Sequence, residues 1–171
     1  MHMLKLVKLE EMYKEQLNEM MEEWWYADEK IVPYAIRKVD YHNFEEYIES
    51  LEEKDESNGR VPDSTFFCLD TETNTFVGAV NIRHYLNESF LLNGGHIGDG
   101  VRPSRRGEGI ATKMIGLALE ECKKLGLEKV LMVCDKENVA SRRTIEKNGG
   151  ILENEVLVEG KIEQRFWIYI K

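Results

Sequence analysis

Residues 98–112 read GDGVRPSRRGEGIAT and run from a predicted strand, through three arginines and two glycines, into an amphipathic helix. Glycine lets the main chain turn tightly and approach a ligand closely. The first turn of a helix leaves amide N–H groups unpaired at the positive end of the helix dipole. These features together predict a cradle for an anion, and a phosphate-bearing cofactor is its natural occupant.

The two common phosphate motifs fit this segment poorly. Gly107 and Gly109 supply only the first half of a dinucleotide fingerprint, because Thr112 stands where its third glycine belongs, and the chain has no Gly-Lys-Ser/Thr triplet. What remains is Arg106-x-x-Gly109-x-Ala111. This pattern resembles the pyrophosphate-binding motif of the GNAT acetyltransferase superfamily, Arg/Gln-x-x-Gly-x-Gly/Ala at the start of a helix. The cofactor of that family is acetyl-coenzyme A.

A second motif strengthens the resemblance. The apolar segment 129–134 is a predicted strand, and DKENVASRRTIEKNGG follows it at residues 135–150. This stretch is similar to the next element of the GNAT family, a strand ending in Asn-x-x-Ser and a helix closing on Glu-Lys-x-Gly. The two motifs stand in the family's order, roughly thirty residues apart, and such an ordered pair is more specific than either motif alone.

The resemblance implies a set of cofactor-binding residues. The main chain around Val101 would pair with the pantetheine arm, the amides of residues 106–112 would hold the pyrophosphate, and Asn138 would bond the arm, with Ser141 supporting that turn. The full set is Val101, Arg106, Gly107, Gly109, Ile110, Ala111, Thr112, Asn138 and Ser141. Helix capping is an alternative role for Asn138 and Ser141. A solvated loop is an equal alternative for Arg102 and Arg105.

Periodicity and turn residues predict an α/β (α+β) chain forming one domain over residues 1–171. The expected architecture is a mixed, mostly antiparallel central sheet of about seven strands flanked by helices, as in a GNAT fold, whose fourth and fifth strands splay apart to admit coenzyme A. Strands are expected at 4–9, 65–69, 75–85, 95–102, 129–134, 152–158 and 162–170, and helices at 11–25, 43–53, 108–125 and 138–148.

Composition restricts the partners and the compartment. A formal net charge of −9 argues against nucleic acid, which needs a basic face, and weakly favours a cationic acceptor. Three scattered cysteines indicate neither a disulfide framework nor a metal site. No leader or membrane-spanning run is recognised, so a cytoplasmic protein is expected. The family resemblance implies a small-molecule or peptide amine as the substrate. The sequence leaves open whether the chain forms a homodimer.

Acetyl transfer to an amine requires a base. An alkyl amine with a pKa of about 10.4 is neutral in roughly one molecule in 2,500 at pH 7, and only the neutral amine attacks a thioester to form the tetrahedral intermediate. His96 and Asp99, on the predicted fourth strand, are the candidate catalytic residues, with a water chain, or His84 and Arg83 on the preceding strand, as the alternatives. A structural histidine bonded within the sheet is the alternative for His96. Asp99 is equally compatible with a turn or bulge.

The chain departs from the family pattern at the general acid. Many members place a tyrosine just before Glu-Lys-x-Gly, and this chain has Ile145 there. Water or a tyrosine from elsewhere, such as Tyr26, Tyr34 or Tyr85, remains as a substitute. The segment 24–34, WWYADEKIVPY, is expected to shape the acceptor site, although Trp24 and Trp25 are equally suited to anchoring a helix in the core.

The resulting hypothesis is an N-acetyltransferase that transfers acetyl from acetyl-CoA to a primary amine by direct attack, without a covalent enzyme intermediate. The acceptor is a small molecule or a protein amino terminus. The alternatives are another acyl donor, a catalytically silent acyl-CoA-binding or sensing module, and a binder of nucleotide phosphates.

Overall fold

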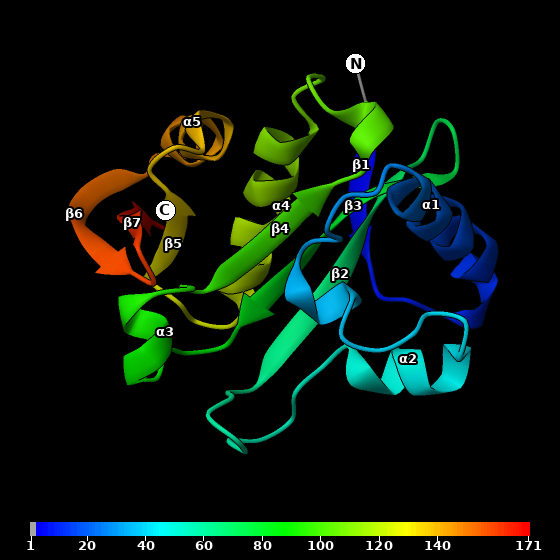
Figure 1. Cartoon of the computed structure of the whole chain (residues 1–171), viewed down its shortest axis with the longest axis horizontal. Coiled ribbons are helices and arrows are strands. Elements are labelled where there is room, and N and C mark those ends of the chain that lie inside the picture. Colours follow the sequence, from blue (N-terminus) through cyan, green and yellow to red (C-terminus); the bar gives the residue numbers. More distant parts are fainter. Residues whose placement is uncertain (1–2) are drawn as a thin grey trace.

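The computed structural model describes residues 3–171, in which strands and helices mix along the whole chain (Figure 1). The strands are β1 (Leu4–Val7), β2 (Asp63–Asp70), β3 (Thr75–Arg83), β4 (Ile97–Val101), β5 (Lys129–Asp135), β6 (Ile151–Val158) and β7 (Lys161–Tyr169). The α-helices are α1 (Lys14–Tyr26), α2 (Phe44–Ser50), α3 (Glu88–Leu92), α4 (Ile110–Lys124) and α5 (Val139–Lys147). Short 3-10 turns are η1 (Glu11–Tyr13), η2 (Tyr34–Ile36) and η3 (Pro103–Arg105).

The strands form two antiparallel sections. One has the order β1-β2-β3-β4 and the other the order β5-β7-β6. The predicted α/β class and the seven strands are confirmed, and the sheet divides where the family resemblance places its splay, between β4 and β5. The division gives β4 one ladder, with β3, and leaves its other edge facing β5.

Two apolar cores lie on opposite faces of the first section. Because neighbouring residues of a strand point to opposite faces, Val80 of β3 joins a core with α4, β5 and β7, whereas Ala79 joins a core with α1 and α2. On α4 the buried positions Ile110, Met114 and Cys122 fall on one face of the helix. The body of α4 is therefore fixed against the sheet, and its first turn follows the loop that leaves β4 (Figure 1).

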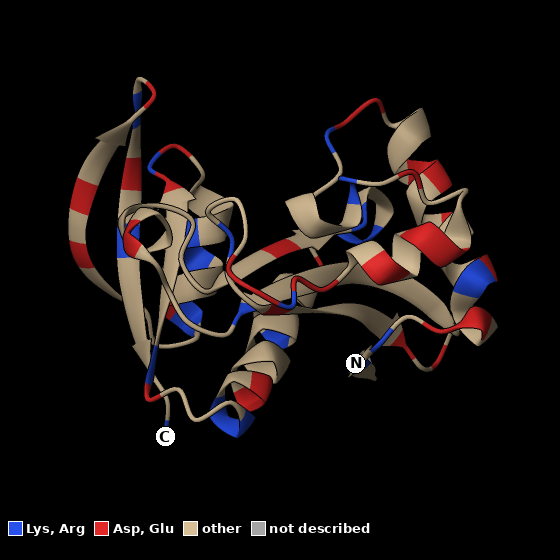
Figure 2. Ribbon diagram, turned by 90° about the horizontal axis from the view of Figure 1, so that it is seen from below, with Lys and Arg blue, Asp and Glu red and all other residues tan. Residues whose placement is uncertain are grey.

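The observed boundaries differ from the predicted ones mainly at element ends. Helix α4 begins at Ile110 and not at residue 108, because Gly109 has a left-handed φ of 79° that helical residues do not adopt. Helix α3 was not predicted, and its start is fixed by Asn87, whose side chain accepts a hydrogen bond from the Phe90 amide. Acidic residues concentrate on α1 and α2, at the right of Figure 2. No helix among residues 3–171 is long and apolar enough to cross a bilayer.

Candidate functional site

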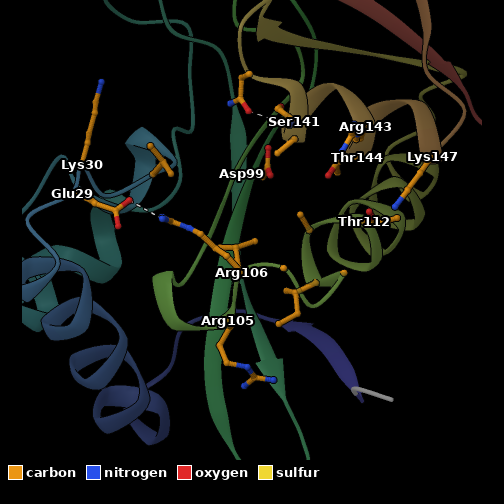
Figure 3. Close-up of a pocket in the computed structure, with 18 residues that line it drawn as sticks. Glu29, Lys30, Asp99, Arg105, Arg106, Thr112, Ser141, Arg143, Thr144 and Lys147 are labelled. Carbon is orange, nitrogen blue, oxygen red and sulfur yellow. Dashed lines mark hydrogen bonds and ion pairs between the residues drawn. The ribbon is translucent and has the colours of Figure 1, made fainter.

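A cavity of about 910 Å³ opens between β4, the loop before α4 and the first turns of α5 (Figure 3). All nine predicted cofactor-binding residues line it, namely Val101, Arg106, Gly107, Gly109, Ile110, Ala111, Thr112, Asn138 and Ser141. Asp99 lines it as well, but His96 does not. The fold thus brings together residues that are up to forty positions apart in the sequence and separates the two candidate bases.

The loop before α4 has the geometry of an anion cradle. Gly107 and Gly109 both have φ of 79°, a conformation that costs other residues energy, and no described atom lies within 4 Å of a Cβ placed on either one. No side chain caps α4. The amides of Ile110, Ala111 and Thr112 have no acceptor among residues 3–171. Unpaired helical amides beside open space fit a pyrophosphate group.

Two of the loop's arginines hold the cradle in place. Arg102 is buried, and its Nε donates to Glu23 of α1 at 2.8 Å while its Nη1 donates to the Phe76 carbonyl oxygen at 3.2 Å. Arg105 donates to Asp70 of β2 at 2.9 Å, where the Asp70 side chain is only 1% exposed. In Figure 3 the Arg105 guanidinium points away from the cavity. The alternative of a solvated loop is therefore wrong for both residues, since each ties the loop to another element.

Other cations face the cavity. Arg106 forms an exposed ion pair with Glu29 at 2.7 Å, drawn as a dashed line in Figure 3. Arg143 and Lys147 of α5 also line the cavity, together with Lys30. Arg143 and Lys147 were not predicted as site residues, although their i, i+4 spacing places them on one helix face and was the signal available in the sequence. They give this wall a positive charge on an otherwise acidic chain.

Asn138 and Ser141 occupy the start of α5. The side-chain oxygen of Asn138 accepts a hydrogen bond from the Ser141 amide at 3.1 Å, so the predicted helix cap is present. Both residues also line the cavity. A cofactor contact from Asn138 is compatible with capping, because the side-chain amide nitrogen is separate from the capping oxygen.

His96 marks the point where the two sheet sections separate. Its amide donates to the Leu131 carbonyl oxygen at 2.8 Å, and the Leu131 amide donates to Nδ1 of the imidazole at 2.9 Å. The imidazole thus takes the place of a main-chain acceptor, and beyond it β4 pairs only with β3. Burial, with a smaller contribution from Arg83, lowers the pKa of His96 to about 4. This is the arrangement of the sheet-bonded histidine that the sequence analysis kept as the alternative.

Asp99, unlike His96, lines the cavity and has a raised pKa. Its half-buried carboxylate lies between β4 and α5 and accepts no hydrogen bond from residues 3–171 (Figure 3). Burial raises its pKa to about 6. A carboxyl group with that pKa is ionised at neutral pH yet basic enough to accept a proton.

The main chain at Gly100 makes room for the loop that follows α1. A Cβ at Gly100 would lie 2.0 Å from the carbonyl oxygen of Val32, so only glycine permits this contact. Val32 lines the cavity beside Glu29 and Lys30. The predicted acceptor-shaping segment 24–34 therefore does border the site, through its second half.

The aromatic residues of that segment have different environments. Trp24 is buried in the core with α1, whereas Trp25 is 75% exposed. Ile145, at the family's tyrosine position, is buried in the core. None of Tyr26, Tyr34 and Tyr85 lines the cavity described above, and Tyr85 instead donates to Glu56. None of the three tyrosines is therefore part of the wall of this cavity.

The family model described as "Acetyltransferase (GNAT) domain" matches residues 7–151. The match covers most of the chain, and the protein belongs to the GNAT acetyltransferase family, whose cosubstrate is acetyl-CoA. No curated protein sequence is similar enough to this chain to count as a match.

Solved structures share the fold at low sequence identity. The microcin C7 self-immunity acetyltransferase MccE, in complex with acetyl-CoA and AMP, has a TM-score of 0.69 at 18% identity, covering 98% of this chain and 92% of MccE. RimL, a ribosomal L7/L12 alpha-N-protein acetyltransferase in complex with coenzyme A, has a TM-score of 0.68 at 14% identity, with 98% and 94% covered. Mutant forms of the spermidine/spermine N-acetyltransferase SpeG from Vibrio cholerae have a TM-score of 0.65 at 17% identity, with 98% and 95% covered.

Proposed function

We propose that the protein transfers the acetyl group of acetyl-CoA to a primary amine by direct attack of the amine, and that residues 1–171 act as a single catalytic domain. The observation that carries the proposal is the 910 Å³ cavity, in which every predicted cofactor-binding residue meets beside the unpaired amides of α4. Acetyl-CoA would supply the activated acyl group as a thioester. A cytoplasmic location fits the three buried, unpaired cysteines.

The residues of the chain fit both parts of the cosubstrate. The α4 amides, with Gly107 and Gly109, would hold the pyrophosphate, and the cationic wall of Arg143 and Lys147 would attract the remaining phosphate. The free edge of β4 near Val101 offers main-chain groups to the amides of the pantetheine arm. Arg102 and Arg105 would keep the cradle in shape through their ties to α1 and β2.

Asp99 is the base in this proposal, and His96 maintains the separation of β4 from β5. The Nδ1 atom of His96 already accepts the Leu131 amide, and a pKa of about 4 leaves the ring a weak base. The free carboxylate of Asp99 lines the cavity and would take the proton that the ammonium group must lose. A leaving thiol with a pKa of about 8.5 exchanges protons with water readily, so solvent serves as the acid.

The silent acyl-CoA-binding or sensing module is the second candidate, and the replacement of the family's tyrosine by the buried Ile145 favours it. Two measurements separate the candidates. Thermal unfolding with acetyl-CoA, coenzyme A and ATP tests the ligand, since a ligand bound only by the native state stabilises it by about 2.7 kcal/mol at a hundredfold excess over Kd. Thiol release in the presence of a primary-amine panel tests turnover.

Amine-dependent thiol release supports the transferase. Stabilisation by acetyl-CoA without thiol release from any amine supports the sensor. Stabilisation by ATP but not by coenzyme A would overturn both candidates and favour a binder of nucleotide phosphates.

A further inference from the structure

A second cavity, of about 310 Å³, lies beside β4 on the face covered by the loop after α1. Gly98 lines this cavity and its neighbour Asp99 lines the cofactor cavity, because successive residues of a strand face opposite sides. Pro33 covers Gly98, with its Cβ 3.3 Å from the position that a Cβ on Gly98 would take. The two cavities therefore lie on opposite faces of β4, and Asp99, the proposed base, is adjacent in the chain to the residue that lines the second cavity.

The cavity wall carries three cations and two carboxylates, an excess of one positive charge. Two of the cations share one carboxylate: Lys38 donates to Glu53 at 3.0 Å and Arg60 donates to the same oxygen at 2.5 Å. The other carboxylate, Asp63, accepts the Glu53 amide at 2.7 Å. Lys38 and Arg60 are thus both ion-paired, through one shared carboxylate.

Arg83 is the third cation, and it forms no ion pair with a carboxylate of residues 3–171. It donates from one terminal nitrogen to the Gly95 carbonyl oxygen at 2.8 Å, and its guanidinium lies 3.9 Å from the centre of the Phe90 ring. Asp63 of β2 stands opposite Arg83 in the antiparallel ladder, but the two side chains do not come within ion-pair distance of each other. Burial lowers the pKa of Arg83 and raises the pKa of Asp63. An anion bound here would therefore stabilise the charge of the partly buried Arg83 guanidinium.

The fixed position of Arg83 suits recognition of a small anion. The ring of Phe90 and the Gly95 carbonyl oxygen hold the guanidinium, while its fork retains further N–H groups that can donate to a carboxylate. The remaining wall includes the apolar side chains of Pro33, Ala35 and Val61. A cavity of this size admits a compact molecule and not a long polycation.

We propose that this cavity receives the acceptor, and that the acceptor is an amine which also carries a carboxylate, bound by Arg83. The inference rests on the proposed acetyl transfer and names its substrate class. A polyamine is disfavoured, because its charges would meet a wall that already has an excess of positive charge. The carboxylate would lie at the Arg83 end, and the amine would pass the unpaired edge of β4 to reach Asp99 on the other face of the strand.

The test uses matched acceptors that differ in one charge. Thiol release is measured with a panel of amino acids and short peptides, each supplied with a free carboxylate and as the carboxamide, and with spermidine. For the wild type, kcat/KM is expected to be at least about tenfold higher for the carboxylate form, the effect of one charge-assisted contact. Arg83→Met should bring the ratio close to one, and Arg83→Lys should keep part of it.

Arg60→Met is the matched control, because Arg60 lines the same cavity and its charge is already paired with Glu53. It should leave the carboxylate preference largely intact. Thermal stabilisation by acetyl-CoA should be the same in all variants, which shows that Arg83→Met is folded and retains the cofactor site. A smaller acetyl-CoA effect in Arg83→Met alone would instead assign Arg83 to the fold and overturn the proposal.

The outcomes distinguish this inference from the proposed function. Amides or spermidine used as well as carboxylates, with thiol release intact, would overturn the inference and leave the acetyltransferase standing. A carboxylate preference unchanged by Arg83→Met would equally overturn it. Absence of thiol release with every amine would overturn the proposed function, and the inference with it.

Discussion

Replacing His96 with asparagine should remove a pH dependence of stability. The folded protein keeps the imidazole neutral, with a pKa of about 4 compared with 6.5 for an unperturbed histidine. Because the folded-state pKa is the lower one, the stabilisation is fully present above pH 6.5 and is lost as the pH falls toward 4. A pKa difference of one corresponds to about 1.36 kcal/mol, so by pH 4 the loss amounts to about 3 kcal/mol.

Asparagine is the appropriate replacement because its side-chain oxygen can take the place of Nδ1 and accept the Leu131 amide without titrating. The assay is urea unfolding of both proteins between pH 7.5 and pH 4. The wild type should lose about 3 kcal/mol more than His96→Asn over this range, while contributions from other groups cancel in the difference. Parallel pH dependences in the two proteins would refute this account of the His96–Leu131 contact.

The same variant tests the assignment of the base. His96→Asn should keep the pH dependence of kcat, because the imidazole does not line the cofactor cavity. If the acidic limb of the wild-type profile disappeared in His96→Asn, His96 would be the base and the role given to Asp99 would be wrong.

Three further predictions concern the base, the cradle and its support. Asp99→Asn should lower kcat by about a hundredfold or more and remove the rise in rate as the pH increases through about 6, with acetyl-CoA binding unchanged. Steady-state kinetics across the pH range measure the effect, and a pH profile identical to that of the wild type would contradict the role of Asp99 as base. Gly109→Val places a β-branched residue at a φ of 79° and fills the cradle, so it should abolish the thermal stabilisation by acetyl-CoA. The control is Gly126→Val, at a φ of 85° beyond α4 and away from the cavity, which should retain that stabilisation. Equal effects of the two substitutions in thermal unfolding would remove the cradle from the proposal. Arg105→Met should lower the free energy of unfolding by about 3 kcal/mol, because it removes the guanidinium that pairs with the buried Asp70. Arg106→Met breaks an exposed ion pair and should lower it by less than about 1 kcal/mol. Urea unfolding of both variants tests this order, and similar losses would argue against a supporting role for Arg105.

The sequence was sufficient for the elements other than α3 and for the glycine-rich loop before α4. Both depend on local chemistry: the period of apolar residues, the glycines at 107 and 109, and the free amides that any helix start presents. The motif spacing therefore predicted all nine residues that now line one cavity, together with the capping role of Asn138. Helix boundaries were less well predicted, because they depend on single residues such as Gly109.

The roles of charged side chains could not be predicted from the sequence. Arg102, Arg105 and Arg106 are nearly adjacent in the chain, yet Arg102 is tied to α1, Arg105 to β2, and Arg106 to Glu29 in the loop after α1. His96 and Asp99 are three residues apart, and the fold gives them pKa values shifted in opposite directions from those of the free side chains. Charge and ionisation depend on distance and burial, which the order of residues does not specify.

The sequence by itself indicated the family, the order of the strands and helices other than α3, and the position of a helix start with free amides, since each follows from neighbours along the chain. The tertiary structure alone decided which groups line each cavity, which arginines remain without a carboxylate, and where the sheet divides. These features come from contacts between segments far apart in the sequence, such as His96 with Leu131 and Gly98 with Pro33. Only packing sets such distances, and the proposed chemistry of the site depends on them.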